Sequence, residues 1–187
     1  ASERIFELLD TAPEPAGGPA GRVGAAGAGP AIAFDRVFFR YDPGSEAWIL
    51  RDVSFTVPAG QSLALVGATG SGKTTIVNLL CRFYEVQQGA VRVDGLDVRE
   101  WDLQALRRRI GIVQQDVFLF SGDIEHNIRL GETAICAARV RQVARYANAS
   151  GFIERLPRGF AQPVAERGAS LSAGQRQLLS FARALAF

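Results

Sequence analysis

One stretch constrains this chain more than any other: Gly67-Ala68-Thr69-Gly70-Ser71-Gly72-Lys73-Thr74. It matches the pattern G-x-x-x-x-G-K-[ST], between a short apolar run at residues 62–66 and a run with helical periodicity at residues 74–83. Strand, glycine-rich turn and helix in this order are typical of a parallel α/β sheet with a phosphate-binding loop. The alternative is a glycine-rich turn with an incidental surface lysine, which the two flanking elements disfavour.

The residue types of this loop suit a nucleoside triphosphate. Glycines let backbone N–H groups approach phosphate oxygens, and the following helix presents its positive end. We expect Lys73 to place a charge near the β and γ phosphates and Thr74 to offer its hydroxyl to Mg²⁺. The predicted ligand is ATP with Mg²⁺, and the predicted contacts are Gly67, Thr69, Gly70, Ser71, Gly72, Lys73, Thr74 and Thr75. Kinases, GTPases and motor ATPases share such a loop, so other residues must decide among them.

Composition and charge restrict the class of protein. The 187 residues are 48% hydrophobic, which suffices for one α/β domain with a tail. The formal charge of +2 comes from 21 basic and 19 acidic residues that are interspersed, which argues against nucleic acid as the main partner. Cys81 and Cys136 form no CxxC pattern, so we expect reduced thiols in packing positions. No apolar run approaches the roughly 18 residues of a membrane-spanning helix.

The chain divides into three parts by composition. Residues 1–11 have the pattern of an amphipathic helix, residues 12–30 are a linker rich in Gly, Ala and Pro, and residues 31–187 form the main domain. That domain is expected to open with antiparallel strands, joined by a turn at residues 42–45. The predicted strands are residues 32–41, 53–57, 62–66, 90–93 and 110–113, and the predicted helices are residues 74–83, 102–108, 133–146 and 175–187.

A second group of small polar residues precedes the last predicted helix: Leu171-Ser172-Ala173-Gly174-Gln175. A hydroxyl, a glycine backbone and a helix N-terminus come together in this group, and the combination suits a phosphate. The alternative is an ordinary N-cap made by Ser170 or Ser172. The residues alone leave both interpretations open.

These five residues resemble the LSGGQ signature of the ABC transporter ATPases, with Ala173 in place of the first glycine. Other parts of the family pattern follow in order. Tyr41 is similar to the A-loop aromatic residue that stacks on adenine, Gln115 to the Q-loop glutamine, and Glu166-Arg167-Gly168 to the X-loop of exporters. The alternatives are an aromatic residue at a strand edge for Tyr41 and a polar strand end for Gln115, with Gln114 as the rival glutamine.

The resemblance implies the nucleotide-binding domain of an exporter half-transporter. Its α/β fold would be that of an ABC-type P-loop NTPase, with an N-terminal antiparallel β subdomain, a RecA-like parallel sheet core and a helical signature subdomain at about residues 116–175. The signature would act in trans, on ATP bound to a second such domain in a head-to-tail homodimer or heterodimer. The implied catalytic residues are Lys73, Gln115 and Ser172, the implied Mg²⁺ ligands are Thr74 and Gln115, and the further ATP contacts are Tyr41, Gln115, Ser172, Gly174 and Gln175.

The resemblance also implies a membrane partner. Residues 116–121 and 124–128 are similar to the exporter segment that touches the transmembrane domain, and residues 1–11 are similar to the end of that domain's last helix. The expected location is the cytoplasmic face of the plasma or inner membrane.

The family pattern is incomplete at its C-terminal end. No Walker B aspartate, catalytic glutamate, D-loop or switch histidine occurs before Phe187, and His126 is expected on a helix surface. We therefore expect this chain to bind nucleotide and to hydrolyse it negligibly, because a positioned base contributes roughly 10²–10⁴-fold in rate. The alternatives are a soluble P-loop NTPase or kinase, which shares only the loop at residues 67–74, and a non-catalytic nucleotide-binding module.

Overall fold

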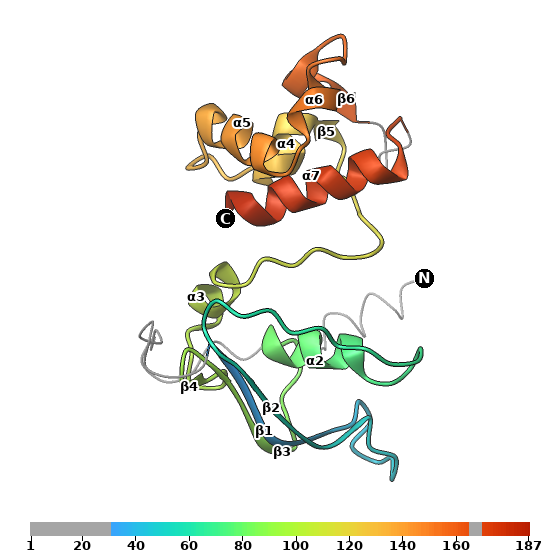
Figure 1. Cartoon of the computed structure of the whole chain (residues 1–187), viewed down its shortest axis with the longest axis vertical. Helices are drawn as coiled ribbons and strands as arrows, with labels where there is room; N and C mark the ends of the chain where they lie inside the picture. The colour runs from blue at the N-terminus through green and yellow to red at the C-terminus, as the bar shows by residue number, and fades with distance from the viewer. Residues whose placement is uncertain (1–30, 165–169) are drawn as a thin grey trace, which may run out of the picture. The chain divides into compact units, whose positions relative to one another are not determined.

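The structure, a computed structural model, describes residues 31–164 and 170–187. The chain divides into two compact units, of which one ends at Arg109 and the other spans Ile110–Phe187 (Figure 1). The predicted helical subdomain at about residues 116–175 falls within the range of the second unit. The predicted helix at residues 1–11, the linker at residues 12–30 and the X-loop resemblance at residues 166–168 lie outside the described residues.

An antiparallel sheet is the framework of the first unit. Its strand order is β2-β1-β3-β4, with β1 Ile32–Phe39, β2 Leu50–Val57, β3 Gln88–Val93 and β4 Leu96–Asp97. Phe34 of β1 lies opposite Phe55 of β2 and Val91 of β3, and the two phenylalanine rings stack with centroids 4.7 Å apart. The turn predicted at residues 42–45 is confirmed, since the Ser45 N–H donates to the Asp42 carbonyl.

Two helices belong to the described part of the first unit. Helix α2 (Lys73–Leu80) buries Thr75 and Leu79 and lies against β3. Helix α3 (Leu103–Arg108) begins after Asp102, whose carboxylate accepts the Ala105 N–H at 2.8 Å as a side-chain N-cap. Trp101, just before that cap, is fully buried and its indole N–H donates to the Val93 carbonyl. The predicted helices at residues 74–83 and 102–108 are thus confirmed to within a few residues.

Two predicted strands are wrong for this structure. Residues 62–66 and residues 110–113 have no regular structure, and neither pairs with a strand in the described part of the chain. A strand of a parallel sheet depends on hydrogen bonds to neighbours on its edges, and an apolar run alone cannot supply them. Accordingly Leu63 is 50% exposed and Val66 is 92% exposed. The sheet in the described residues is therefore antiparallel, and the predicted parallel core is not formed among them.

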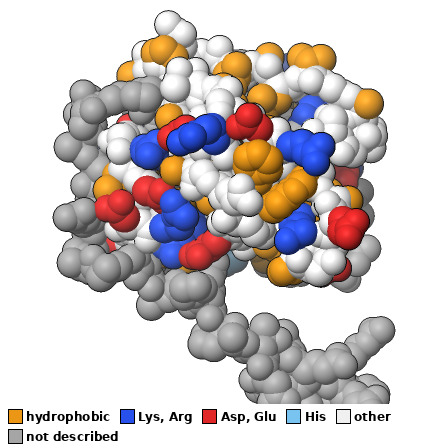
Figure 2. Space-filling view, turned by 90° about the horizontal axis from the view of Figure 1, so that it is seen from below, with side chains coloured by type: hydrophobic (Ala, Val, Ile, Leu, Met, Phe, Trp, Pro, Cys, Tyr) orange, Lys and Arg blue, Asp and Glu red, His pale blue; other side chains and the backbone are white. Residues whose placement is uncertain are grey.

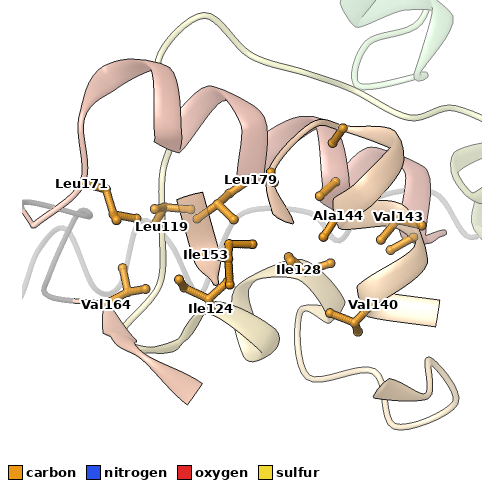
Figure 3. Packing of buried hydrophobic residues seen from close by; sticks show 14 of the residues in the cluster. Leu119, Ile124, Ile128, Val140, Val143, Ala144, Ile153, Val164, Leu171 and Leu179 are labelled. Carbon is orange, nitrogen blue, oxygen red and sulfur yellow. The ribbon is translucent and has the colours of Figure 1, made fainter. Parts of the chain in front are cut away.

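The second unit is mainly helical. One buried apolar cluster runs through it, and Figure 3 shows Leu119, Ile124, Ile153 and Leu179 close together, with Val140 farther along the same cluster. The helix predicted at residues 133–146 begins later than expected, after Cys136, while the one predicted at residues 175–187 begins two residues earlier. The elements are β5 Gly122–Asp123, α4 Ile124–Arg129, α5 Ala137–Tyr146, α6 Ser150–Ile153, the 3-10 helix η1 Gly159–Ala161, β6 Pro163–Val164 and α7 Ala173–Ala186.

The buried Asn127 and the partly buried Arg183 tie α4 and α7 to the segment at residues 118–123. The fully buried Asn127 amide donates to the Phe120 and Asp123 carbonyls, and its oxygen accepts the Phe120 N–H at 2.8 Å. From α7, the Arg183 guanidinium donates to the Asn127 carbonyl at 2.9 Å and to the Phe118 carbonyl at 3.1 Å. These bonds satisfy backbone groups of an irregular segment, which fixes its shape.

The structure also tests the sequence predictions about surface charge, the two cysteines and His126. Basic and acidic side chains alternate over the face drawn in Figure 2, in line with their interspersion along the chain. Within the described residues, no helix has the length and apolar character to cross a membrane. Cys81 is buried as predicted, but the prediction of a packing position for Cys136 is wrong, because this residue is the exposed N-cap of α5. His126 lies exposed on α4, as predicted.

Candidate nucleotide-binding site

The glycine-rich loop lies open to solvent in the first unit. All residues from 61 to 70 are exposed, and Gly70 and Gly72 have φ values of 85° and 88°. Gly72 is the N-cap of α2 and provides no side-chain cap, and its carbonyl accepts the first helical hydrogen bond, from Ile76. The N–H groups at the start of α2 therefore precede the first helical bond and remain free of helical partners. Such a helix start suits an anion.

Lys73 brings a positive charge to the middle of this loop. Its ammonium donates to the Gly67 carbonyl at 2.8 Å, to the Ala68 carbonyl at 2.7 Å and to the Ser71 hydroxyl at 3.3 Å. These hydrogen bonds are exposed to solvent, so the charge lies at the surface and not in the interior. Lys73 is also the only lysine of the chain, because the other basic residues are arginines. The loop thus closes around a single ammonium group that anions can reach.

The two threonines that follow differ in exposure. Thr74 is exposed, which leaves its hydroxyl accessible, whereas Thr75 is only 4% exposed. The buried Thr75 hydroxyl is 3.1 Å from the phenolic oxygen of Tyr41. This contact brings Tyr41 to α2, although the two residues are 34 positions apart in sequence. Thr69 lies in the exposed turn of the loop.

Tyr41 belongs to a cluster of three aromatic rings. Its ring makes edge contacts with Phe39 and with Tyr84, each at a centroid distance of 4.9 Å. Phe39 is buried, whereas Tyr41 and Tyr84 are each 46% exposed. The sequence offered no signal for Tyr84, which follows α2 and belongs to no motif. The structure therefore adds an aromatic neighbour to the predicted base-stacking residue.

The predicted signature forms the start of α7 in the second unit. Ser172 is the N-cap, since its hydroxyl oxygen accepts the Gln175 N–H at 3.2 Å while the Gln175 side chain accepts the Ser172 N–H at 2.9 Å. This is a capping box, so of the two candidate caps Ser172 is the one observed. A hydroxyl that accepts in this way still has its proton to donate. Gly174 is exposed, and a Cβ there would meet only the Ser172 hydroxyl, at 4.0 Å.

Gln115 lies exposed in a bend of the second unit, and Gln114 beside it is exposed as well. The structure thus brings Tyr41 together with the loop and α2 in one unit, and Ser172 together with Gln175 in the other. A hollow of about 230 Å³ is lined in part by Gln114, Phe118, Phe120 and Arg183, and Gln115 is not among its lining residues. Burial lowers the pKa of the Arg183 guanidinium from its usual value.

Comparison with known proteins now defines the class. The family model described as ABC transporter matches residues 50–187. The chain belongs to the ABC transporter family. Membership of this family implies the use of ATP, which the loop and the start of α2 had indicated.

Individual relatives narrow this to the ATP-binding domain of exporters. The chain is 47% identical to the ATP-dependent lipid A-core flippase of Alkalilimnicola ehrlichii, over 99% of this chain and 31% of that protein. It is 44% identical to the probable multidrug resistance ABC transporter ATP-binding/permease protein YheH of Bacillus subtilis, over 98% of this chain and 27% of that protein. Both names are those of ATP-dependent or ATP-binding transport proteins.

A solved structure of a bacterial Atm1-family ABC exporter with ATP bound superposes with a TM-score of 0.88 at 39% identity, over 99% of this chain and 32% of that chain. This match confirms the predicted fold class, an ABC-type P-loop α/β fold with an antiparallel N-terminal sheet. Across these relatives, the chain spans between 27% and 32% of their length.

Proposed function

We propose that this chain is the ATP-binding domain of an ABC exporter, in which binding and hydrolysis of ATP drive transport of a substrate out across a membrane. The observation that carries the proposal is the exposed loop at residues 67–74, which closes around Lys73 and leads into an uncapped helix start. An open anion site of this kind, in a member of this family, supports the binding of a nucleoside triphosphate.

The residues present fit Mg-ATP. The free N–H groups at the start of α2 and the Lys73 ammonium are donors for the phosphate oxygens, and the exposed Thr74 hydroxyl is an oxygen ligand of the type that Mg²⁺ accepts. We assign the second protein ligand to the exposed Gln115 side chain. When bound, Mg²⁺ would neutralise charge on the phosphates. Lys73, Gln115 and Ser172 are the residues to which we assign catalytic roles.

The second predicted phosphate-binding group, at residues 171–175, acts in trans on the nucleotide of another such domain. The Ser172 hydroxyl keeps a proton to donate beyond its cap, and Gly174 leaves open space for close approach. A γ-phosphate with donors on both sides is the arrangement that stabilises phosphoryl transfer. We therefore propose a head-to-tail pair of nucleotide-binding domains, in which Ser172, Gly174 and Gln175 face the partner's ATP.

The segment at residues 116–128 is the part of the chain that we expect to contact the membrane partner. Phe118 and Phe120 are about half exposed, with rings 5.1 Å apart, so they present an apolar surface at a fixed place. An exposed aromatic pair of this kind suits contact with another protein surface. Phe118 and Phe120 would thus contact a transmembrane domain at the cytoplasmic face of the membrane.

Lys73 gives a direct test, because one lysine can be followed alone. An acetylating reagent should modify Lys73 and the N-terminal amine, and mass spectrometry distinguishes the two. With Mg-ATP at 100 times its dissociation constant, only about 1% of the sites are free, so modification of Lys73 should slow roughly 100-fold. The N-terminal amine should react at an unchanged rate and serves as the internal control. Equal modification of Lys73 with and without Mg-ATP would refute the proposed site.

A matched pair of variants completes the test. Lys73→Ala removes a charged hydrogen-bond donor and should weaken Mg-ATP binding roughly 10- to 100-fold in calorimetric titration. Arg108→Ala removes a positive charge from the exposed end of α3 in the same unit and should leave the affinity unchanged. Equal weakening in both variants would indicate a general charge effect and would contradict the proposal.

A further inference from the structure

Two aromatic rings contact the Tyr41 ring from one side. Phe39 and Tyr84 each contact it at 4.9 Å, and these two rings are 5.8 Å from one another. Three centroids with these separations form a compact triangle, so Phe39 and Tyr84 approach Tyr41 from the same side. Tyr41 remains 46% exposed. Its exposed surface is therefore directed away from the two rings that support it.

The other end of the Tyr41 side chain is fixed by hydrogen bonds. Its phenolic oxygen is 3.1 Å from the Thr75 hydroxyl, and it accepts a hydrogen bond from the Asn78 amide at 3.3 Å. Thr75 and Asn78 lie one turn apart on α2, the helix whose first turn follows the phosphate loop. The ring plane of Tyr41 is thus set jointly by the aromatic pair and by α2.

Base stacking depends on such a fixed plane. A nucleobase stacked on an aromatic side chain gains most when the ring is already oriented, because no rotamer freedom is then lost on binding. Phe39 is buried within β1 and supports the sheet as well. Tyr84 lies in no helix or strand and is half exposed, so it has no comparable part in the sheet. Its ring contact with Tyr41 can therefore act mainly to orient Tyr41.

We propose that Tyr84 is a positioning residue for the nucleobase: its ring holds Tyr41 in a stacking orientation, with Asn78 and Thr75 fixing the Tyr41 hydroxyl. The proposal rests on the nucleotide-binding function proposed above and adds three residues' roles to it. Tyr84 acts through Tyr41 and is not assigned a contact with the phosphates. Its removal should therefore affect ligands that carry a base and spare those that do not.

The test compares Mg-ATP with Mg-tripolyphosphate, which lacks the base and the ribose. Tyr84→Leu keeps an apolar side chain but removes the ring, and it should weaken ATP binding about two- to tenfold, the range expected for one aromatic pair. Tripolyphosphate binding should not change, which also shows that the phosphate loop is still folded. Tyr84→Phe keeps the ring contact and should retain wild-type affinity for both ligands. Asn78→Ala should weaken ATP binding by a smaller factor.

A double-mutant cycle distinguishes positioning from an independent contact. In a Tyr41→Leu background there is no ring left to orient, so Tyr84→Leu should change ATP affinity no further. An undiminished effect of Tyr84→Leu in that background would overturn the proposal, and so would equal weakening of ATP and tripolyphosphate by Tyr84→Leu alone. Lys73→Ala must weaken both ligands if the phosphate site is correct. A wild-type chain that binds neither ligand would overturn the proposed function and this inference together.

Discussion

The starts of α2 and α7 are both predicted to face phosphate, but they are built differently. Helix α2 follows Gly72, which has a left-handed backbone and no side chain to cap the helix. Helix α7 follows Ser172, which forms a reciprocal capping box with Gln175. The first start leaves its N–H groups for an external partner, whereas the second satisfies two of them internally. An anion site can therefore be built by omitting a cap or by using one whose hydroxyl proton remains free.

This difference in capping predicts which interactions stabilise the N-terminus of α2 and which stabilise the N-terminus of α7. The start of α2 has the Lys73 contacts with the loop carbonyls and should gain further stability from an anion, because no side chain caps it. The start of α7 needs no ligand, because Ser172 and Gln175 satisfy each other's N–H groups. Substitutions at the two starts should consequently have different effects on folding and on binding.

The largest effect is expected at Gly72. Its φ of 88° is unfavourable for alanine, and a Cβ would lie 2.7 Å from a methyl carbon of Leu50. Gly72→Ala should lower the free energy of unfolding of the first unit by about 2 kcal/mol or more, from the backbone cost and the steric overlap together. Urea unfolding should show this loss. Gly60→Ala is the matched control, since Gly60 also has a positive φ but open space around it, and it should cost about 1–2 kcal/mol.

Thiol labelling reports the same change at the other end of α2. Cys81, the C-cap of α2, is 1% exposed, and burial raises the pKa of its thiol above the usual value. A raised pKa means less reactive thiolate at pH 8, so Cys81 should label slowly in the wild type and faster in Gly72→Ala. The exposed Cys136 should label at the same rate in both proteins. Two results together would contradict the expected steric cost: an unchanged rate of Cys81 labelling, and the same loss of unfolding free energy in Gly72→Ala as in Gly60→Ala. They would show that the Leu50 side chain moves aside at little cost.

A smaller effect on folding is expected at Ser172. Ser172→Ala removes the N-cap and should destabilise the second unit by about 1 kcal/mol, as measured by thermal unfolding. The chain's own affinity for Mg-ATP should not change, because the hydroxyl is proposed to act on a partner's nucleotide. In a complete transporter, the loss of one donor to the γ-phosphate should lower ATPase activity on the order of 10²-fold.

Ser172→Asp separates the two roles of the hydroxyl. The carboxylate can still cap α7, so stability should be retained, but it has no proton to donate and repels phosphate. ATPase activity should fall as in Ser172→Ala. Full activity in Ser172→Asp would contradict the assignment of a donor in trans and leave Ser172 as a cap alone.

The smallest effect is expected at Gly174. The residue lies in the first turn of α7 with open space at its Cβ position, so Gly174→Ala should stabilise the second unit by about 0.5–1 kcal/mol. ATP binding to the chain by itself should be unaffected. If the glycine allows close approach of a partner's nucleotide, ATPase activity of the complete transporter should fall although the domain is more stable. A destabilised second unit would show that the surroundings of α7 are more crowded than in this structure.

The sequence predicted the elements whose signals are local. The helix at residues 102–108, the β-branched and aromatic run at residues 32–41 and the cap by Ser170 or Ser172 depend on neighbouring residues, so these features could be placed within a few positions. The resemblance to the ABC family likewise depended on short motifs, and the family comparison confirms it. The roles of the individual site residues remain predictions, for which the experiments above are the test.

What could not be predicted depends on contacts between distant residues. The apolar run at residues 62–66 has the composition of a buried strand, but a strand requires partners that the run itself cannot specify. Tyr84 has no motif, and its importance arises only from its distance to Tyr41. The same holds for Asn127 and Arg183, whose hydrogen bonds join residues 56 positions apart. Burial of these polar groups is invisible in a hydropathy pattern.

The hydrogen bonds of Arg183 connect α7 firmly to α4 and to the segment before it. Ser172 and Arg183 stand at two positions of one continuous helix, about 16 Å apart along its axis. Arg183 holds the Phe118 carbonyl, and Asn127 holds Phe120 by both of its backbone polar groups. Hydrogen bonds and one helix thus connect the first turn of α7 to the exposed pair Phe118 and Phe120. We therefore expect a displacement at Ser172 to shift the two phenylalanines as well, because no flexible connection lies between them in the described part of this unit.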